Sequence, residues 1–130
     1  MRKHRESIDL DKVKHGAPIP MGSRVGNMIF SSGIMGQDPA TGELPADPRL
    51  QARFCFENLK AMLEKAGSKL GDVGHVTVFI KDNSMRPHVN EFWAIHFPDP
   101  HDRPARHAVV SDLQGGMLVQ LEIIAVIESA

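Results

Sequence analysis

Segments 73–81 and 117–127 alternate with the period of two that predicts a β-strand, and each carries apolar side chains on both of its faces. A strand of this kind is stable only where both faces of its sheet are covered. The pattern therefore restricts the fold to one with a central sheet buried on both sides. The opposed sets are Val76, Val78 and Ile80 against His75, Thr77 and Phe79 in the first segment, and Leu118, Gln120, Glu122, Ile124 and Val126 against Val119, Leu121 and Ile123 in the second.

Two helices are predicted around the first of these strands. One begins at Asp47-Pro48, where Asp can cap free amides and Pro fits the first turn, and it ends at Gly67. The other begins near Ser84 and ends at about Phe97, before two prolines. Each has an apolar stripe at helical spacing, made of Ala52, Cys55, Phe56, Leu59, Met62, Leu63 and Ala66 in one and of Val89, Phe92, Trp93 and His96 in the other.

Shorter strands complete the pattern. Residues 21–35 predict a hairpin that turns at Gly26-Asn27, and 106–112 predicts a strand joined to 117–127 as a second hairpin. The order hairpin, helix, strand, helix, hairpin predicts an α+β fold, with a mixed β-sheet and two helices packed on one face. Because two helices shield only one side of a sheet, we expect homo-oligomerisation to cover the other side.

The chain has 130 residues, the size of one domain, and we expect a single domain over 16–130 after a mobile N-terminal arm over 1–15. A formal net charge of −1 and only 5% aromatic residues argue against nucleic acid as a partner. The single Cys55 suits a reducing compartment, and no segment has the pattern of a membrane span or a signal peptide. A cytoplasmic location with no membrane partner is therefore expected.

A few polar positions are candidates for chemistry. Arg106 starts a predicted strand, where its guanidinium either binds a carboxylate or is simply solvated or ion-paired. Gln120 and Glu122 lie on an apolar strand face, so they either serve a site or pair with a neighbouring strand or subunit. Ser32 either serves a site or bonds only to backbone; its predicted strand face also carries Met28, Phe30 and Ile34.

Metal and cofactor chemistry is not predicted. The seven His residues show no compact ligand spacing and have no Cys ligands to support them, so we expect no metal site. The sequence has no phosphate-binding Gly-rich loop, dinucleotide fingerprint or nucleophile elbow, so we expect no cofactor. Cys55 lies on the apolar stripe of the first helix and is predicted to be core, not a nucleophile.

A series of collinear motifs runs from about Gly16 to the last strand. It includes Gly26-Asn-Met-Ile-Phe-Ser-Ser-Gly33, Pro39-Ala-Thr-Gly-Glu43, Gln51-Ala-Arg53, Thr77-Val-Phe-Ile-Lys-Asp82, Val89-Asn90, Arg103-Pro-Ala-Arg106 and Glu122-Ile-Ile-Ala-Val126. Together these motifs resemble the RidA/YjgF family of reactive enamine and imine deaminases. The resemblance implies a chorismate-mutase-like (YjgF-like) fold, assembled as a homotrimer with the sheets packed inward as a barrel and pockets at the subunit interfaces.

The resemblance also implies roles for particular residues. Arg106 corresponds to the Arg that binds the substrate carboxylate, and Asn90 corresponds to an Asn of the pocket. Ser32 and Gly33 form the Ser-Gly motif, whose Ser belongs to the pocket and helps to orient the imine. These positions predict a site for a small carboxylate substrate.

Other positions depart from the family pattern. Ile19 stands where many members have a pocket Tyr, and Ala108 stands where they have a Cys. Gln120 stands where the deaminating members have a Glu that positions or activates water, while the second Glu of that strand is kept as Glu122. A Gln can hold a water but cannot accept its proton, so Gln120 is expected to orient the water that attacks the imine.

The resemblance and these residues together leave three functions open. The first is an imine or enamine deaminase, a hydrolase that converts 2-imino or 2-enamino acids to 2-keto acids and ammonia. The second is a non-catalytic binding or regulatory protein for small carboxylates such as keto acids. The third, a ribonuclease or translation inhibitor, is disfavoured by the neutral charge and the scarcity of aromatic residues.

Overall fold

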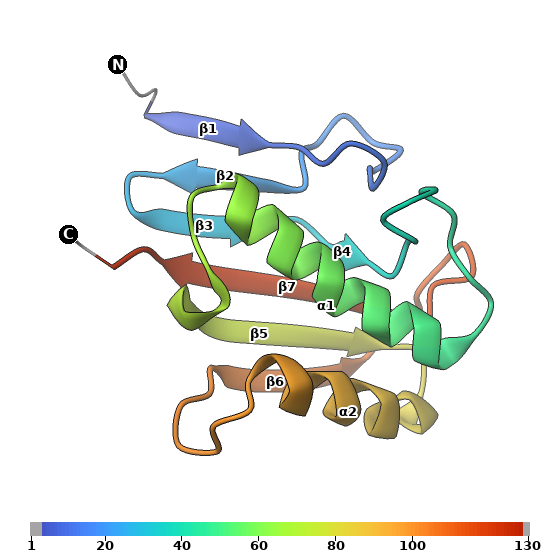
Figure 1. The fold of residues 1–130 in the computed structure, drawn as a ribbon. Helices are drawn as coiled ribbons and strands as arrows, with labels where there is room; N and C mark the ends of the chain where they lie inside the picture. Colours follow the sequence, from blue (N-terminus) through green and yellow to red (C-terminus); the bar gives the residue numbers. More distant parts are fainter. Residues whose placement is uncertain (1–3, 129–130) are drawn as a thin grey trace.

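The computed structural model describes residues 4–128, so residues 1–3 and 129–130 of the predicted arm and domain lie outside the described part. The chain forms a six-strand path with a short extra strand, two α-helices and two 3₁₀ turns (Figure 1). In chain order the elements are β1 (Arg5–Ile8), β2 (Gly22–Val25), β3 (Met28–Ser31), β4 (Ile34–Met35), α1 (Pro48–Lys65), η1 (Leu70–Asp72), β5 (Val73–Ile80), η2 (Asn83–Met85), α2 (Arg86–His96), β6 (Ala105–Val110) and β7 (Val119–Val126).

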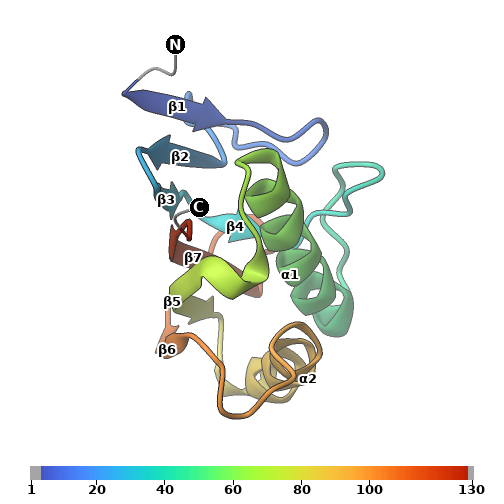
Figure 2. The ribbon, with the colours of Figure 1, turned by 60° about the vertical axis from the view of Figure 1, so that its left-hand side comes forward.

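The predicted fold class is confirmed. The strands form one mixed sheet in the order β1-β2-β3-β7-β5-β6, with β4 also paired to β7 and with β5 and β6 parallel. Both helices lie on the same side of this sheet (Figure 2). Along β7, Val119, Leu121, Ile123 and Ala125 are buried beneath the helices, and the alternate residues point to the side that no helix covers.

One strand pairing in the prediction is wrong. The strands near 106–112 and 117–127 do not form a hairpin, because β5 lies between β6 and β7 and pairs with both. A parallel β5–β6 pair needs a crossover connection, which α2 provides. The connection that contains residues 113–116 therefore crosses β5 instead of closing a hairpin. As a result, β7 lies in the centre of the sheet.

The expected continuous strand over 28–35 is interrupted at Ser32-Gly33. Ile29 and Ile34 are both buried, although a single regular strand would place them on opposite faces. The side-chain oxygen of Ser31 accepts a hydrogen bond from the Ile123 amide at 2.7 Å and so fills the interrupted ladder. The strand period predicts that Ile34 shares a face with Phe30. This prediction is wrong, because the interruption places Ile34 in the core while Phe30 is exposed.

Helix α1 forms as predicted. The carboxylate of Asp47 accepts hydrogen bonds from the Arg49 and Leu50 amides at 2.8 and 3.3 Å, and Gly67 adopts a φ of 82° just beyond the helix end. The predicted apolar stripe is buried. Two polar residues, Gln51 and Asn58, are also fully buried on this helix, and they donate hydrogen bonds to the loop carbonyls of Pro45 and Gln37 respectively.

The segment expected to be a mobile arm contains β1. This strand pairs antiparallel to β2 at one edge of the sheet, and Ile8 and Val13 contribute to the core. The predicted boundary at residue 16 therefore does not separate a mobile arm from the domain, because residues before it belong to the sheet and the core. The sequence signal is weak because a few apolar residues among many charges give no clear period, while backbone pairing with β2 supplies the order.

The side of the sheet opposite the helices remains uncovered in the single chain. Phe30, Ile124 and Val126 on this side are 39%, 40% and 46% exposed, and Phe30 pairs directly with Ile124. The expectation that another copy covers this face stays a prediction. Within the described residues, neither α-helix combines the length and the apolar character of a membrane span.

Candidate functional site

Arg106 is positioned by contacts with helix α2. Its Nη2 donates a hydrogen bond to Asn90 Oδ1 at 2.8 Å, and its guanidinium carbon lies 4.8 Å from the centre of the Trp93 ring. An amide acceptor and an aromatic face together hold the guanidinium plane in one direction. The predicted pair of Arg106 and Asn90 is therefore brought together by the fold.

The local sequence explains this placement. Asn90 and Trp93 are three residues apart on α2, so they lie on one helix face toward the sheet. Arg106 is the second residue of β6, where it pairs in register with the buried Val76 of β5. In the preceding loop, Arg103 Nε donates to the Phe97 carbonyl at 2.9 Å and fixes the path from the end of α2 into the strand.

Arg106 keeps its charge without a carboxylate partner. Partial burial, and next the neighbouring Arg86, lower its pKa below the ordinary value, but a guanidinium stays protonated at any physiological pH. Across residues 4–128, none of the ion pairs includes Arg106. The alternative of a salt-bridged Arg106 is thus not what the described chain forms, and the guanidinium remains available to an anion.

Gln120, Gly33 and Ser32 form a second group at the strand interruption. Gln120 pairs with Met35 of β4, and its half-buried side chain lies so close to Gly33 that a Cβ there would overlap the side-chain amide. The Ser32 amide donates to the Met21 carbonyl at 2.9 Å. Gly33 is therefore required for the space that the Gln120 amide occupies.

The Arg106 and Gln120 side chains lie on opposite sides of the sheet. Arg106 is in register with Val76 and, through it, with Ile123, both of which are buried beneath the helices. Gln120 pairs with Phe79 and alternates with the buried residues of β7, so its side chain points to the uncovered side. Within a single chain, the side chains of Arg106 and Gln120 therefore do not line the same site.

Ala108, Glu122 and Ile19 complete the predicted set. Ala108 lines a small cavity of about 10 Å³ together with Arg106 and Asn90, which is room for about one water molecule. Glu122 is exposed on the uncovered side and pairs with Thr77, two residues along β7 from Gln120. Ile19 is 48% exposed in the loop before β2, away from the Arg106 cavity.

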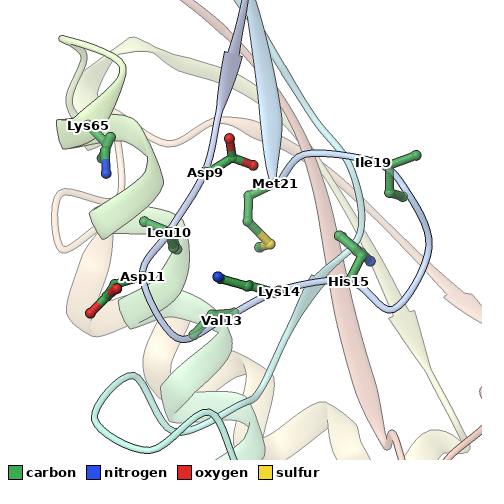
Figure 3. Close-up of a pocket in the computed structure, with 9 residues that line it drawn as sticks. All are labelled: Asp9, Leu10, Asp11, Val13, Lys14, His15, Ile19, Met21 and Lys65. Carbon is green, nitrogen blue, oxygen red and sulfur yellow. The ribbon is translucent and has the colours of Figure 1, made fainter.

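Ile19 borders a separate and larger cavity. This cavity of 570 Å³ lies between the segment 9–21 and the end of α1 (Figure 3). Lys14 and Met21 extend into it, while the Ile19 side chain lies at its rim (Figure 3). None of the other predicted site residues lines it.

Arg86 and Trp93 also lie beside Arg106, although none of the sequence motifs predicts them as site residues. Arg86 lines the same small cavity as Arg106, and Trp93 stacks on the Arg106 guanidinium. Helical spacing offered a signal, because Arg86, Asn90 and Trp93 follow one another at intervals of four and three residues. The apolar stripe of the helix predicts Trp93 only as a core residue.

Cys55 is fully buried, and burial raises the pKa of its thiol above the ordinary value. A thiol in this state is a poor nucleophile, which agrees with its prediction as core. In the part of the chain that the structure describes, no three His, Cys, Asp or Glu side chains are grouped so that they could hold a metal ion.

Comparisons with known proteins place this geometry in context. A sequence profile described as Endoribonuclease L-PSP matches residues 18–127. The 2-iminobutanoate/2-iminopropanoate deaminase of Escherichia coli strain K12 is 40% identical over 111 residues, which cover 84% of this chain and 87% of that protein.

Solved structures have the same fold. RidA from an Antarctic Psychrobacter superposes with a TM-score of 0.86 at 35% identity, covering 94% of this chain and 99% of that one. TdcF of E. coli, solved with bound serine, superposes with a TM-score of 0.85 at 33% identity, covering 95% of this chain and 99% of that one.

Proposed function

This chain belongs to the RidA/YjgF family, and from that membership and the geometry at Arg106 we propose that it hydrolyses 2-imino or 2-enamino acids to 2-keto acids and ammonia. A relative with 40% identity is named a deaminase of 2-iminobutanoate and 2-iminopropanoate, both of which are small 2-imino acids. The buried free thiol of Cys55 suits the reducing cytoplasm, where we expect the reaction to occur.

The observation that carries the proposal is the Arg106 guanidinium. It is held by an amide oxygen and an aromatic ring, has no carboxylate partner in the described chain, and borders a small cavity. Every 2-imino acid has a carboxylate next to the reacting carbon. Binding of that carboxylate by Arg106 would fix the position of the imine carbon relative to the protein.

The chemistry requires little beyond orientation. A protonated imine has an electrophilic carbon, to which water adds its oxygen; the C–N bond then breaks. The two hydrogens of the imine nitrogen and the two of the water leave together on ammonium, so no external base is consumed. In this proposal the Gln120 amide holds the attacking water, and the departing nitrogen takes up its protons.

The site is completed by a second copy of the chain in this proposal. Arg106 and Asn90 lie on the helix-covered side near the β6 edge, whereas Gln120 belongs to the uncovered side. The cavity beside Arg106 is too small for a substrate. A homotrimer with sites between neighbouring chains would bring one chain's Arg106 to the other's Gln120.

A second candidate function is supported by Gln120 itself. Since Gln120 cannot accept a proton, the same geometry would also serve a non-catalytic protein that binds keto acids through Arg106. Such a protein would be stabilised against heat by 2-ketobutyrate and would release no ammonia from imino acids. The serine-bound structure of the relative TdcF supports binding of a small carboxylate in either case.

The deciding experiment measures ammonia release from 2-imino acids that an amino-acid oxidase generates in the same solution. Wild type should exceed the buffer rate, and Arg106→Met should lower kcat/KM by about ten- to a hundredfold, the equivalent of losing a charge-assisted hydrogen bond. Arg53→Gln, a charge change on the exposed side of α1, is the matched control and should keep the wild-type rate. Ammonia release equal to buffer for wild type would refute the deaminase proposal.

A further inference from the structure

Arg86 is a second cation at the Arg106 cavity. It occupies the first position of α2, and both arginines line the same small cavity with Asn90 and Ala108. The remaining walls are apolar side chains of β5 and α2, namely Val78, Ile80 and Val89. The cavity itself has room for no more than about one water molecule, but the two guanidiniums and the apolar side chains beside it are suited to a small anion with a short hydrocarbon part that binds between neighbouring chains.

Both guanidiniums are oriented by neutral groups. Arg86 Nε donates to Asn83 Oδ1 at 2.9 Å, as Arg106 Nη2 donates to Asn90 Oδ1 at 2.8 Å. An amide oxygen fixes the direction of a guanidinium without cancelling its charge. Within residues 4–128 neither arginine takes part in an ion pair, so two positive charges face this cavity without a counter-ion.

The nearby carboxylate of Asp82 does not pair with either arginine. It caps the η2 turn that precedes α2, where it accepts hydrogen bonds from the Ser84 amide and hydroxyl. The Arg86 charge lowers the pKa of Arg106, which means that the two cations are close enough to repel each other. A ligand with two negative charges would remove this repulsion.

We propose that Arg86 is a specificity-determining residue that binds the second carboxylate of a dicarboxylic 2-imino acid, while Arg106 binds the carboxylate next to the imine. This inference rests on the proposed function, because it names the substrate class of the same site. The reaction itself is unchanged: the iminium and one water give a 2-keto dicarboxylic acid and ammonium.

The test compares two substrates of equal chain length. An amino-acid oxidase acting on glutamate gives a five-carbon imine with two carboxylates, and its action on norvaline gives a five-carbon imine with one. Wild type should have the lower KM for the dicarboxylic imine. Arg86→Gln should raise that KM by about tenfold, as expected for the loss of one charge-assisted contact, and should change the KM of the other imine less than about twofold.

Two variants serve as controls. Arg86→Lys keeps the charge and should retain most of the preference, whereas Arg53→Gln removes a distant charge and should leave both KM values unchanged. Binding of 2-oxoglutarate and 2-oxopentanoate, measured by calorimetry, gives a readout that does not depend on turnover. Tighter binding of 2-oxoglutarate that is lost in Arg86→Gln supports the inference even where no ammonia is released, a result that would refute only the deaminase.

A different result would refute the role of Arg86 without refuting the deaminase. Turnover of both imines with equal KM values that Arg86→Gln does not alter would overturn the role of Arg86 and leave the deaminase proposal standing. Absence of both turnover and keto-acid binding would overturn both proposals.

Discussion

In the proposed reaction the Gln120 amide holds the attacking water, and an amide cannot act as a base. Gln120→Glu should therefore raise kcat by about tenfold or more, since general-base catalysis typically contributes two or more orders of magnitude. The carboxylate accepts a proton only when ionised, so the added rate should be lost as the pH falls through the pKa of the new Glu and should be full above it. The measurement is the pH profile of ammonia release for wild type and variant.

Gln120→Met is the control for this prediction, because it keeps the length of the side chain and removes both the base and the hydrogen bonds. It should release ammonia more slowly than wild type. A Glu variant that is no faster than wild type at any pH would show that Gln120 does not face the reacting water.

Gly33 and Gly36 lie three residues apart, and their substitution should affect different properties, namely activity for Gly33 and stability for Gly36. A Cβ on Gly33 would overlap the movable end of Gln120, so Gly33→Ala should reduce ammonia release while changing the free energy of unfolding by less than about 1 kcal/mol. A Cβ on Gly36 would overlap the Gln51 backbone, which cannot rotate away, so Gly36→Ala should lower the free energy of unfolding by about 1–3 kcal/mol. Denaturant titration measures the free energy of unfolding of both variants, and the ammonia assay measures the activity of Gly33→Ala. Equal destabilisation by the two substitutions would contradict this explanation.

The individual site residues could be predicted from the sequence better than their contacts. Arg106 and Asn90 are both part of recognisable motifs, but their hydrogen bond joins residues 16 positions apart on different elements. Arg86 belongs to none of these motifs, and its importance depends on which charges the fold leaves unpaired around it. Such a property arises from packing and has no local sequence signature.

At the scale of elements, Gln51 links α1 to two loops. Its Nε2 donates to the Pro45 and Gly116 carbonyls at 2.8 and 3.0 Å, and its Oε1 accepts from the Leu118 amide at 2.8 Å. The side chain is fully buried, so Gln51→Leu would leave all three loop groups unsatisfied.

Gln51→Leu should therefore lower the free energy of unfolding by about 3 kcal/mol, measured by urea titration. Gln114→Leu removes one exposed side-chain hydrogen bond and should change it by less than about 0.5 kcal/mol. If the two substitutions have similar effects, Gln51 does not hold these elements together.

The helices could be predicted because their signals are local. Asp47 and Pro48 define the start of α1, and the apolar stripe identifies its buried side. Strand pairing is different, since period-two alternation shows that a segment is a strand but does not identify its neighbour. This explains why β6 and β7 were expected to be paired, although β5 lies between them.

At the scale of the whole molecule, the side of the sheet opposite the helices leaves apolar side chains exposed in the single chain. The exposed Phe30, Ile124 and Val126 should be covered by other copies, which predicts a mass of three times 14.3 kDa by light scattering. The sequence alone favoured association through this side, because both faces of its central strands are apolar. A monomer that retains ammonia release would contradict a site shared between chains.

The most direct measurement of the central claim mixes two variants that are each expected to release ammonia much more slowly than wild type. Arg106→Met damages the carboxylate-binding half of the site, and Gln120→Ala damages the half that holds water. After co-refolding at equal amounts, trimers with sites shared between neighbours should regain about a quarter of the wild-type ammonia release, because about one interface in four then combines two intact halves. A mixture no more active than the sum of its separate variants would contradict a substrate held between Arg106 of one chain and Gln120 of the next.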